Sequence, residues 1–425
     1  MESQGERRGL RERLGYIIAL GLFAKFFVDI TVQLYNPFLT IYAGGLGVSA
    51  VVMGRLVSVR NFMGLTAPLF GALADRAGYR LVMRLGLAMA GAGMLLLATG
   101  GTMAVLVLAM MLAGMGQAAY TPSLHAYVSA RSSYERRAQA LGIVEYAWAL
   151  AGIVGLFLVG QLIEVSSWRE PLLVLGGMLI AAGVLLGALP PQPGTRAGHS
   201  ALPRSARWRD GGSAIQMVRG ALPALRDGLR GLFDFGPHWR SALGSVLVMV
   251  FNFFAVFHVL IIHGGWLEQE YGLGAGQLGS VALLLGVFDW IASISVSAFG
   301  DRLGKKRSVA IGVGGMVLFF ALLPMLNRSL PLALASIVLP RFFFEFATVS
   351  NFPLLSEQLP ERRGKMMSLS ISGGVLGTAI AASTGPTAYL NFGVWGLGPV
   401  SAASAAVSFL ILLFVVREAP HRESP

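Results

Sequence analysis

Apolar segments long enough to span a membrane recur along the whole chain, and they limit the possible folds more than any other feature. A helix needs about 20 mostly apolar residues to cross a bilayer. Only 13% of the residues are charged, against about 25% in ordinary soluble domains, which excludes a soluble fold. We place twelve transmembrane helices near residues 15–42, 51–73, 81–100, 103–127, 139–162, 171–189, 241–263, 276–299, 308–326, 331–355, 366–390 and 395–416.

The twelve predicted helices form two groups of six on either side of a polar segment. We therefore predict an all-α integral membrane protein with an N-terminal bundle over 1–189, a cytoplasmic linker over 190–239 and a C-terminal bundle over 240–425. Within the linker, apolar residues from Ile215 to Leu232 recur at spacings of three and four, which is typical of a helix on a membrane surface. A solvated linker with accidental periodicity is the alternative.

The basic residues predict the orientation in the membrane. The chain has 33 Lys and Arg residues against 21 Asp and Glu, and only Arg169 and Arg328 fall in loops on the side opposite the N-terminus. This asymmetry predicts that both termini are cytoplasmic, so the net charge of +12 reports topology and no nucleic-acid partner is expected. The first apolar run is too long for a cleaved signal peptide, and we predict it to be an uncleaved span. The chain has no cysteine, which excludes disulfides and thiolate metal sites.

A charged motif occurs once in each half of the chain. The stretch FGALADRAGYR, Phe70–Arg80, matches VSAFGDRLGKK at 296–306 with an offset of 226 residues. A second pair of charged loops, containing Glu135 and Glu361, has the same offset. Two separate matches at one offset indicate two related, pseudo-symmetric six-helix halves.

The first copy of the motif resembles the signature loop of the major facilitator superfamily, which has the form Gly-x-x-x-Asp-Arg-x-Gly-Arg/Lys. The resemblance implies two six-helix bundles that transport a small molecule by alternating access. It also implies that the motif locks the cytoplasmic side in one conformation; a simple interfacial anchor is the alternative. Small residues at Gly71 and Ala72 allow close helix packing. The implied gate residues are Gly71, Asp75, Arg76, Gly78 and Arg80, then Asp301, Arg302, Gly304 and Lys306, with Ser297 in place of the first glycine of the second copy.

Ionisable residues inside spans are costly to bury and indicate functional sites. They are absent from the interiors of the third, sixth, ninth and twelfth predicted helices. The family resemblance implies that these four helices are peripheral and that the others line a central cavity. Our candidates for proton coupling or substrate binding are Lys25, Asp29, Gln33, Asn36, Arg60, Glu145, Asp289, Arg341 and Glu345.

The first helix carries the most informative pattern. Lys25, Asp29, Gln33 and Asn36 form one polar stripe, and Pro37 can kink the helix. The segment resembles the first-helix acidic motif of drug/proton antiporters. We predict that Asp29 binds and releases a proton during transport, because burial favours the neutral carboxyl and the neighbouring lysine favours the charged one. A static Lys25–Asp29 pair is the alternative.

The other candidates allow two readings each. Arg60 and Arg341 could flank one chamber and bind an anionic group, or they could be counter-ions of Asp29 and Glu345. Glu145 and Asp289 could hold a proton or another cation, or could form structural pairs. No metal or cofactor site is predicted, because His258 and His263 do not share a helix face. The helix at 103–127 also offers polar groups. The polar groups of that helix are Gln117, Thr121 and His125.

The sequence has no phosphate-binding loop with Walker spacing, so an ion gradient is the expected energy source. We predict a monomeric, multi-pass plasma-membrane transporter that couples movement of a small organic solute to protons or another cation. The antiporter resemblance favours efflux, although Met110 stands where these antiporters have an arginine. Uptake of a sugar or an organic anion is the alternative, and a transporter-like sensor or a membrane enzyme is a remote one.

Overall fold

Helices make up the regular structure of the described chain. The computed structural model describes residues 2–132, 134–189, 239–358 and 363–418. The predicted linker and its surface helix fall outside these residues, as do the side chains of residues 2–14, 72, 75–76, 134–138, 297–301, 356 and 363–365. Within the described ranges, every regular element is a helix.

The N-terminal half contains the first six predicted spans, three of which are interrupted. Its elements are α1 (Glu2–Gln33), α2 (Tyr35–Gly45), α3 (Ala50–Phe62), η1 (Met63–Thr66), α4 (Ala67–Ala77), α5 (Tyr79–Thr99), α6 (Met103–Arg131), α7 (Tyr134–Leu150), η2 (Ala151–Gly155), α8 (Leu156–Val165), α9 (Arg169–Leu185) and η3 (Leu186–Ala188). The first span breaks at Leu34, and Phe38 has non-helical dihedral angles beside Pro37. The kink that Pro37 predicted is therefore present.

The C-terminal half contains the other six spans. Its elements are α11 (Trp239–Leu260), α12 (His263–Tyr271), α13 (Ala275–Leu303), α14 (Lys305–Leu326), α15 (Leu330–Gln358), α16 (Arg363–Phe392) and α17 (Val394–Phe414). Together α11 and α12 form one broken span, and each of the others is a single helix.

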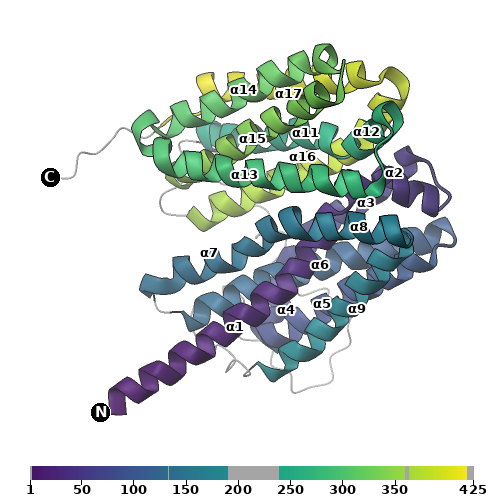
Figure 1. The fold of residues 1–425 in the computed structure, drawn as a ribbon. Helices are drawn as coiled ribbons and strands as arrows, with labels where there is room; N and C mark the ends of the chain where they lie inside the picture. The colour runs from purple at the N-terminus through teal and green to yellow at the C-terminus, as the bar shows by residue number, and fades with distance from the viewer. Residues whose placement is uncertain (1, 133, 190–238, 359–362, 419–425) are drawn as a thin grey trace, which may run out of the picture.

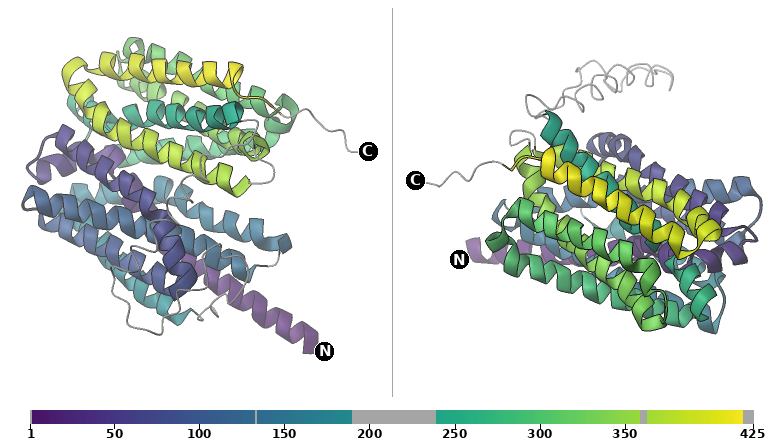
Figure 2. Two further views of the ribbon diagram at one scale, coloured as in Figure 1. Left: turned by 180° about the vertical axis from the view of Figure 1, so that it is seen from behind. Right: turned by 90° about the horizontal axis from the view of Figure 1, so that it is seen from above.

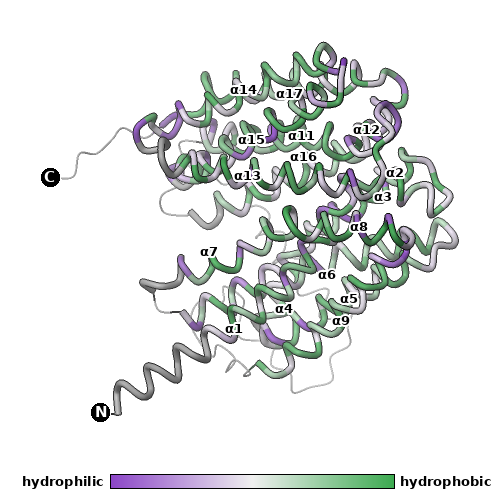
Figure 3. Tube along the Cα trace, in the orientation of Figure 1, coloured by the Kyte–Doolittle hydropathy of each residue, from purple (hydrophilic) through white to green (hydrophobic). Residues whose placement is uncertain are grey.

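Eleven helical segments of the described chain are long and apolar enough to cross a membrane, and Figure 3 shows hydrophobic residues along most of their lengths. The expected helix at 51–73 is the exception, because it consists of α3, η1 and α4 in succession. α3 has 13 residues and α4 has 11, which is shorter than a full span. Pro68 lies in the first turn of α4 and has no N–H to continue the preceding helix. The second of the twelve predicted spans is therefore present in pieces.

The two halves form two bundles, with α1–α9 in the lower part of Figure 1 and α11–α17 in the upper part. α1 begins and α17 ends at the same end of the molecule, as the left view of Figure 2 shows. We name this end the terminal end and the opposite one the distal end. The main contacts between the bundles join α3 to α16, α8 to α13 and α2 to α12. Helices α5, α9, α14 and α17, which lack internal charge, take no part in these contacts. Their predicted peripheral position agrees with this arrangement.

Glycines lie at the closest contacts between the bundles, all near the distal end. A Cβ atom placed on Gly264 of α12 would lie 1.8 Å from the carbonyl oxygen of Pro37 in α2. A Cβ on Gly54 of α3 would lie 2.2 Å from the Ala382 carbonyl oxygen in α16, and one on Gly160 of α8 would lie 2.6 Å from the Ala275 carbonyl oxygen. We name these three glycine contacts the distal seam. Backbone from one bundle therefore packs directly on backbone of the other.

The repeated motif has the same local structure in both halves. Gly78 precedes α5 with a φ of 93° and Gly304 precedes α14 with a φ of 82°, a region that favours glycine. Two residues later in each copy, Arg80 donates to the Leu189 carbonyl oxygen at 2.6 Å and Lys306 to the Val416 carbonyl oxygen at 2.7 Å. Each basic side chain thus satisfies a carbonyl just beyond the last helix of its own half.

Candidate functional site

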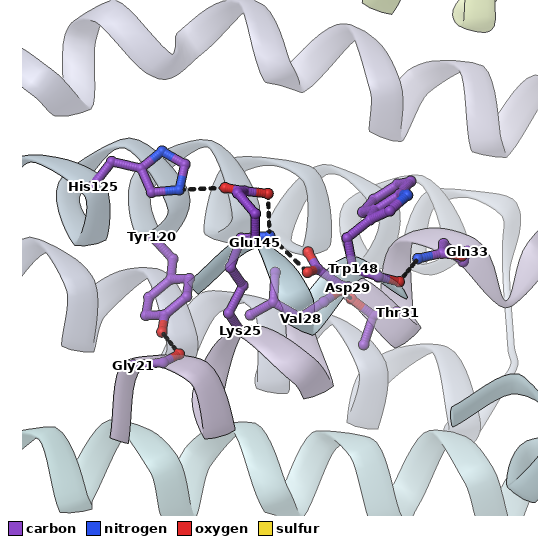
Figure 4. Close-up of polar contacts among 10 residues, drawn as sticks. All are labelled: Gly21, Lys25, Val28, Asp29, Thr31, Gln33, Tyr120, His125, Glu145 and Trp148. Carbon is purple, nitrogen blue, oxygen red and sulfur yellow. Dashed lines mark hydrogen bonds and ion pairs between the residues drawn. The ribbon is translucent and has the colours of Figure 1, made fainter. Parts of the chain in front are cut away.

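A buried ion cluster lies where α1 packs against α6 and α7 (Figure 4). The Lys25 ammonium donates to the Asp29 carboxylate at 2.7 Å and to the Glu145 carboxylate at 3.2 Å. His125 Nε2 lies 2.7 Å from the other oxygen of Glu145. Lys25 and Asp29 are each 2% exposed, whereas about half of the Glu145 side chain is exposed. One turn of α1 separates the lysine and aspartate, so a single helix face presents both to Glu145.

This N-terminal cluster contains two carboxylates and one lysine. With His125 neutral it carries one net negative charge, which is costly to keep in a low-dielectric environment. One bound proton on either carboxylate would leave one negative charge to balance the lysine. Its composition therefore suits a group that gains and loses a single proton.

Gln33 continues the polar stripe toward the middle of the molecule. Its side-chain nitrogen donates to the Trp148 carbonyl oxygen at 3.1 Å. That carbonyl lies next to a π-helical turn, Ala151–Gly155, which shifts the backbone hydrogen bonds of the span by one residue. A Cβ on Gly152 would lie 3.2 Å from the Gln33 side-chain oxygen, so the glycine leaves room for this amide.

A second ion cluster lies between α13 and α15. The Arg341 guanidinium binds Asp289 in a two-pronged geometry, with Nε–Oδ1 and Nη2–Oδ2 distances of 2.8 and 2.7 Å. Glu345 lies one turn after Arg341 and hydrogen-bonds the side chain of Ser293. This C-terminal cluster again has two carboxylates for one cation. The sequence offered Glu345 as a counter-ion of Arg341 in the alternative to anion binding, but the paired forks of guanidinium and carboxylate join Arg341 to Asp289.

A cavity of about 450 Å³, which includes space open to solvent, lies between the two bundles. Four of the predicted site residues line it, two from the first span and two from the second ion cluster. They are Gln33, Asn36, Asp289 and Arg341. Trp148, Phe257 and His263 also line the cavity, and sequence reasoning did not select them as site residues. Aromatic residues in an apolar helix give no signal of their own, because most of them pack in the core.

Arg60 lies apart from this cavity. It is 2% exposed and donates to the Gln117 side-chain oxygen at 2.9 Å and to that of Asn61 at 3.2 Å. The predicted common chamber between Arg60 and Arg341 is therefore not what this conformation contains, because Arg341 lines the cavity and Arg60 lies among α2, α3 and α6. Helix depth predicted from sequence does not fix which way a side chain faces.

The predicted gate motif is only partly described. The side chains of Asp75, Arg76 and Asp301 lie outside the described residues, and Arg302 is exposed. A Cβ added to Gly71 would meet no atom within 4 Å, so the close packing predicted there is absent in this conformation. The reason is that the bundles meet at the distal end, whereas the main contacts of α4 are with helices of its own half. The gate role of the motif remains a prediction.

Comparison with known proteins finds transporters among the relatives, two of which match over most of the chain and one over less than half of it. The chain is 23% identical over 407 residues to the uncharacterized MFS-type transporter YwfA of Bacillus subtilis, covering 95% of this chain and 92% of that protein. It is 23% identical to the glucose transporter GlcP of Staphylococcus epidermidis, covering 75% and 71%. It is 27% identical to the multi-drug resistance efflux pump PmrA of Streptococcus pneumoniae, covering 40% and 43%.

The fold and the family agree with these relatives. The crystal structure of a D-xylose-proton symporter superposes with a TM-score of 0.72 at 16% identity, covering 95% of this chain and 98% of that chain. The family model described as Major Facilitator Superfamily matches residues 21–267 and again 245–425. These two matches cover nearly the whole sequence and both six-helix halves. The chain therefore belongs to the Major Facilitator Superfamily and is a multi-pass membrane transporter, not an enzyme.

Proposed function

We propose that this transporter couples the movement of protons to the export of a small organic solute. The observation that carries the proposal is the N-terminal cluster of Lys25, Asp29, Glu145 and His125. A lysine shared by two carboxylates has a charge balance that one proton changes from negative to neutral. We propose that the cluster exchanges one proton and that the two forms favour different conformations of the bundle.

Proton binding changes the contacts of Lys25. When Asp29 is charged, the ammonium is held between Asp29 and Glu145 and ties α1 to α7. When Asp29 binds a proton, its attraction for the ammonium weakens, and Lys25 pairs with Glu145 alone. Without the bond to Lys25, Asp29 no longer restrains the turn of α1 that precedes Gln33, which lines the cavity. Protonation and solute binding are thereby linked through one helix.

The lining of the cavity favours an uncharged or cationic solute with an aromatic or apolar part. Trp148 and Phe257 offer flat apolar surfaces, and Gln33 and Asn36 offer amide groups. The guanidinium of Arg341 is already engaged by both oxygens of Asp289. An anionic solute would have to displace that carboxylate, so we do not place an anion in this cavity.

Export is the direction that we favour, and the similarity to the efflux pump PmrA supports it. Proton-coupled uptake of a sugar is the second candidate, because the chain also resembles the glucose transporter GlcP over a longer region. The same two ion clusters would serve either direction, since coupling requires only that the proton and the solute bias the same conformational change.

We further propose that the protein acts as a monomer in the plasma membrane with both termini in the cytoplasm. The distribution of Lys and Arg residues supports this orientation. With this orientation, the distal seam lies on the extracellular side. We interpret the gate motif as the contact that closes the cytoplasmic side in the opposite conformation.

Inverted membrane vesicles with an imposed pH gradient test the proposal. A solute panel is screened for gradient-driven movement by the wild type, and Asp29→Asn and Glu145→Gln are compared with it. We expect Asp29→Asn to lose gradient-driven accumulation while it retains solute exchange at equal pH, because exchange needs no net proton movement. Glu170→Gln, a carboxylate change in the first turn of α9, is the matched control and should behave as the wild type.

The outcomes separate coupling from direction. Gradient-driven accumulation that is unchanged in both Asp29→Asn and Glu145→Gln would overturn the assignment of the proton site. If the solute moves in the same direction as the protons, the proposal of export is replaced by uptake, and the assignment of the proton site stays in place.

A further inference from the structure

Arg60 is a buried cation whose described partners are all neutral. It lies in the last turn of α3 and is 2% exposed. Its two terminal nitrogens donate to the amide oxygens of Gln117 and Asn61. Among the described residues no carboxylate lies within ion-pair distance of the guanidinium, whereas Lys25 and Arg341 both have one. A buried charge of this kind is strongly unfavourable without a counter-ion.

Three hydrogen-bond donors around this charge lack acceptors. Nε of Arg60 has no partner, and neither do the hydroxyl groups of Tyr35 and Tyr42. Both tyrosines are fully buried. The Arg60 guanidinium lies 5.8 Å from the centre of the Tyr35 ring, and the Tyr35 and Tyr42 rings are 6.0 Å apart. Buried polar groups without partners are rare in native proteins, and three such donors on two contacting helices, α2 and α3, point to a missing ligand.

We propose that Arg60, Tyr35 and Tyr42 form a binding site for a small monovalent anion. One negative charge would balance the guanidinium, and its lone pairs would accept from Nε and from both phenolic hydroxyl groups. A water molecule could satisfy the donors but would leave the positive charge uncompensated. An inorganic halide and the carboxylate of an organic acid share the required chemistry.

The local backbone explains why these groups meet. The break of the first span at Leu34 starts α2, which carries Tyr35 and Tyr42 about two turns apart, on either side of the kink at Phe38. On the other side, Gly114 of α6 lets that helix approach α3, because a Cβ there would lie 2.2 Å from the Arg60 carbonyl oxygen. This close approach brings Gln117 within reach of the guanidinium.

The anion site is separate from the solute cavity, and access to it depends on the distal seam. Arg60, Tyr35 and Tyr42 are not among the residues that line the cavity. The helix that carries both tyrosines, α2, also packs against α12 at Gly264. Separation of α2 from α12 would therefore uncover the site. The inference requires neither proton coupling nor a direction of transport.

Thermal unfolding of the full-length protein in detergent tests the site. The melting temperature is measured at constant ionic strength while chloride, bromide or acetate replaces sulfate, a divalent anion that does not match the single charge of the site. We expect a saturable rise for the wild type, because a ligand that binds only the folded protein stabilises it. Arg60→Gln should abolish the rise. The double variant Tyr35→Phe/Tyr42→Phe keeps the rings and should weaken the apparent anion affinity by at least about tenfold.

Two controls make the result specific. Arg55→Gln removes an exposed arginine from the same helix and should leave the anion response unchanged. Tyr120→Phe removes a buried hydroxyl that donates to the Gly21 carbonyl oxygen and should also leave it unchanged. A response to halides identifies an inorganic anion, and a response to acetate alone identifies a carboxylate.

The proposal is overturned if the wild type shows no saturable anion response, provided that Gly264→Ala, which loosens the distal seam, shows none either. It is also overturned if the tyrosine double variant folds and keeps the full response. Neither result would affect the proton-coupling experiment, which uses other residues and another assay.

Discussion

The distal seam predicts that one added methyl group shifts the conformational balance of the transporter. The change is Gly264→Ala in α12. In the described conformation the new Cβ would lie 1.8 Å from the Pro37 carbonyl oxygen. Atoms of this kind essentially never approach closer than 3.0 Å, so α2 and α12 must separate by at least 1.2 Å, the difference between the two values.

The magnitude follows from the nature of the obstacle. The atom in contact is a backbone oxygen, which cannot rotate away as a side chain can. Overpacking of this kind costs about 1–3 kcal/mol. The conformation with the distal seam open does not bear this cost, so the ratio of open to closed molecules should rise about fivefold to 150-fold.

Spin-label distance measurement can detect the shift directly. The chain has no cysteine, so a pair introduced by Gly44→Cys in α2 and Gln269→Cys in α12 reports only on this seam. Both positions are exposed. In Gly264→Ala, the population with the longer label-to-label distance should grow at the expense of the shorter one.

A matched control separates the seam contact from the general effect of a Gly→Ala change in a helix. Gly177→Ala replaces a helical glycine of α9 at which a Cβ would meet no atom within 4 Å. Its distance distribution should equal that of the wild type. If folded Gly264→Ala also kept the wild-type distribution, the inference that this backbone contact holds the distal end closed would be refuted.

Three further predictions concern stability. Gly78→Ala and Gly304→Ala should each destabilise the folded protein by about 1–3 kcal/mol in chemical unfolding, because both glycines combine a positive φ with an extended ψ, which other residues rarely adopt; a change below the error of the assay would contradict the backbone geometry. Lys25→Met should destabilise by about 3–5 kcal/mol, because Asp29 loses its buried counter-ion, and the double variant Lys25→Met/Asp29→Asn should recover part of the loss in the same measurement. Arg341→Lys should lower stability by about 1.5–3 kcal/mol, because lysine cannot form the two-pronged contact; an unchanged melting temperature would argue against that contact.

The spans and the repeat could be predicted from sequence because they depend on local patterns. Hydropathy sets the length of a span, and the break at 62–67 escaped because a short 3₁₀ turn leaves the mean hydropathy unchanged. The motif offset of 226 residues predicted that Gly78 and Gly304 have equivalent structure, and both have positive φ.

The partners of the charged residues could not be predicted in the same way. Lys25 and Glu145 are 120 residues apart and meet because of how α1 and α7 are rotated about their axes. Hydropathy carries no information on that rotation. Arg60 and Arg341 both lie inside apolar spans. Arg341 pairs with a carboxylate, whereas Arg60 has amides and unpartnered phenols nearby. Only the packing of helices distinguishes them.

Different atoms close the distal seam and select the solute. Its contacts are made by backbone carbonyl oxygens against glycines, and backbone atoms are the same in every residue type. Side chains such as Trp148 and Phe257, which line the cavity, do not form those contacts. Mutation of the cavity side chains can therefore alter which solute fits while the distal seam stays intact. New specificities can arise in this way without loss of the conformational change.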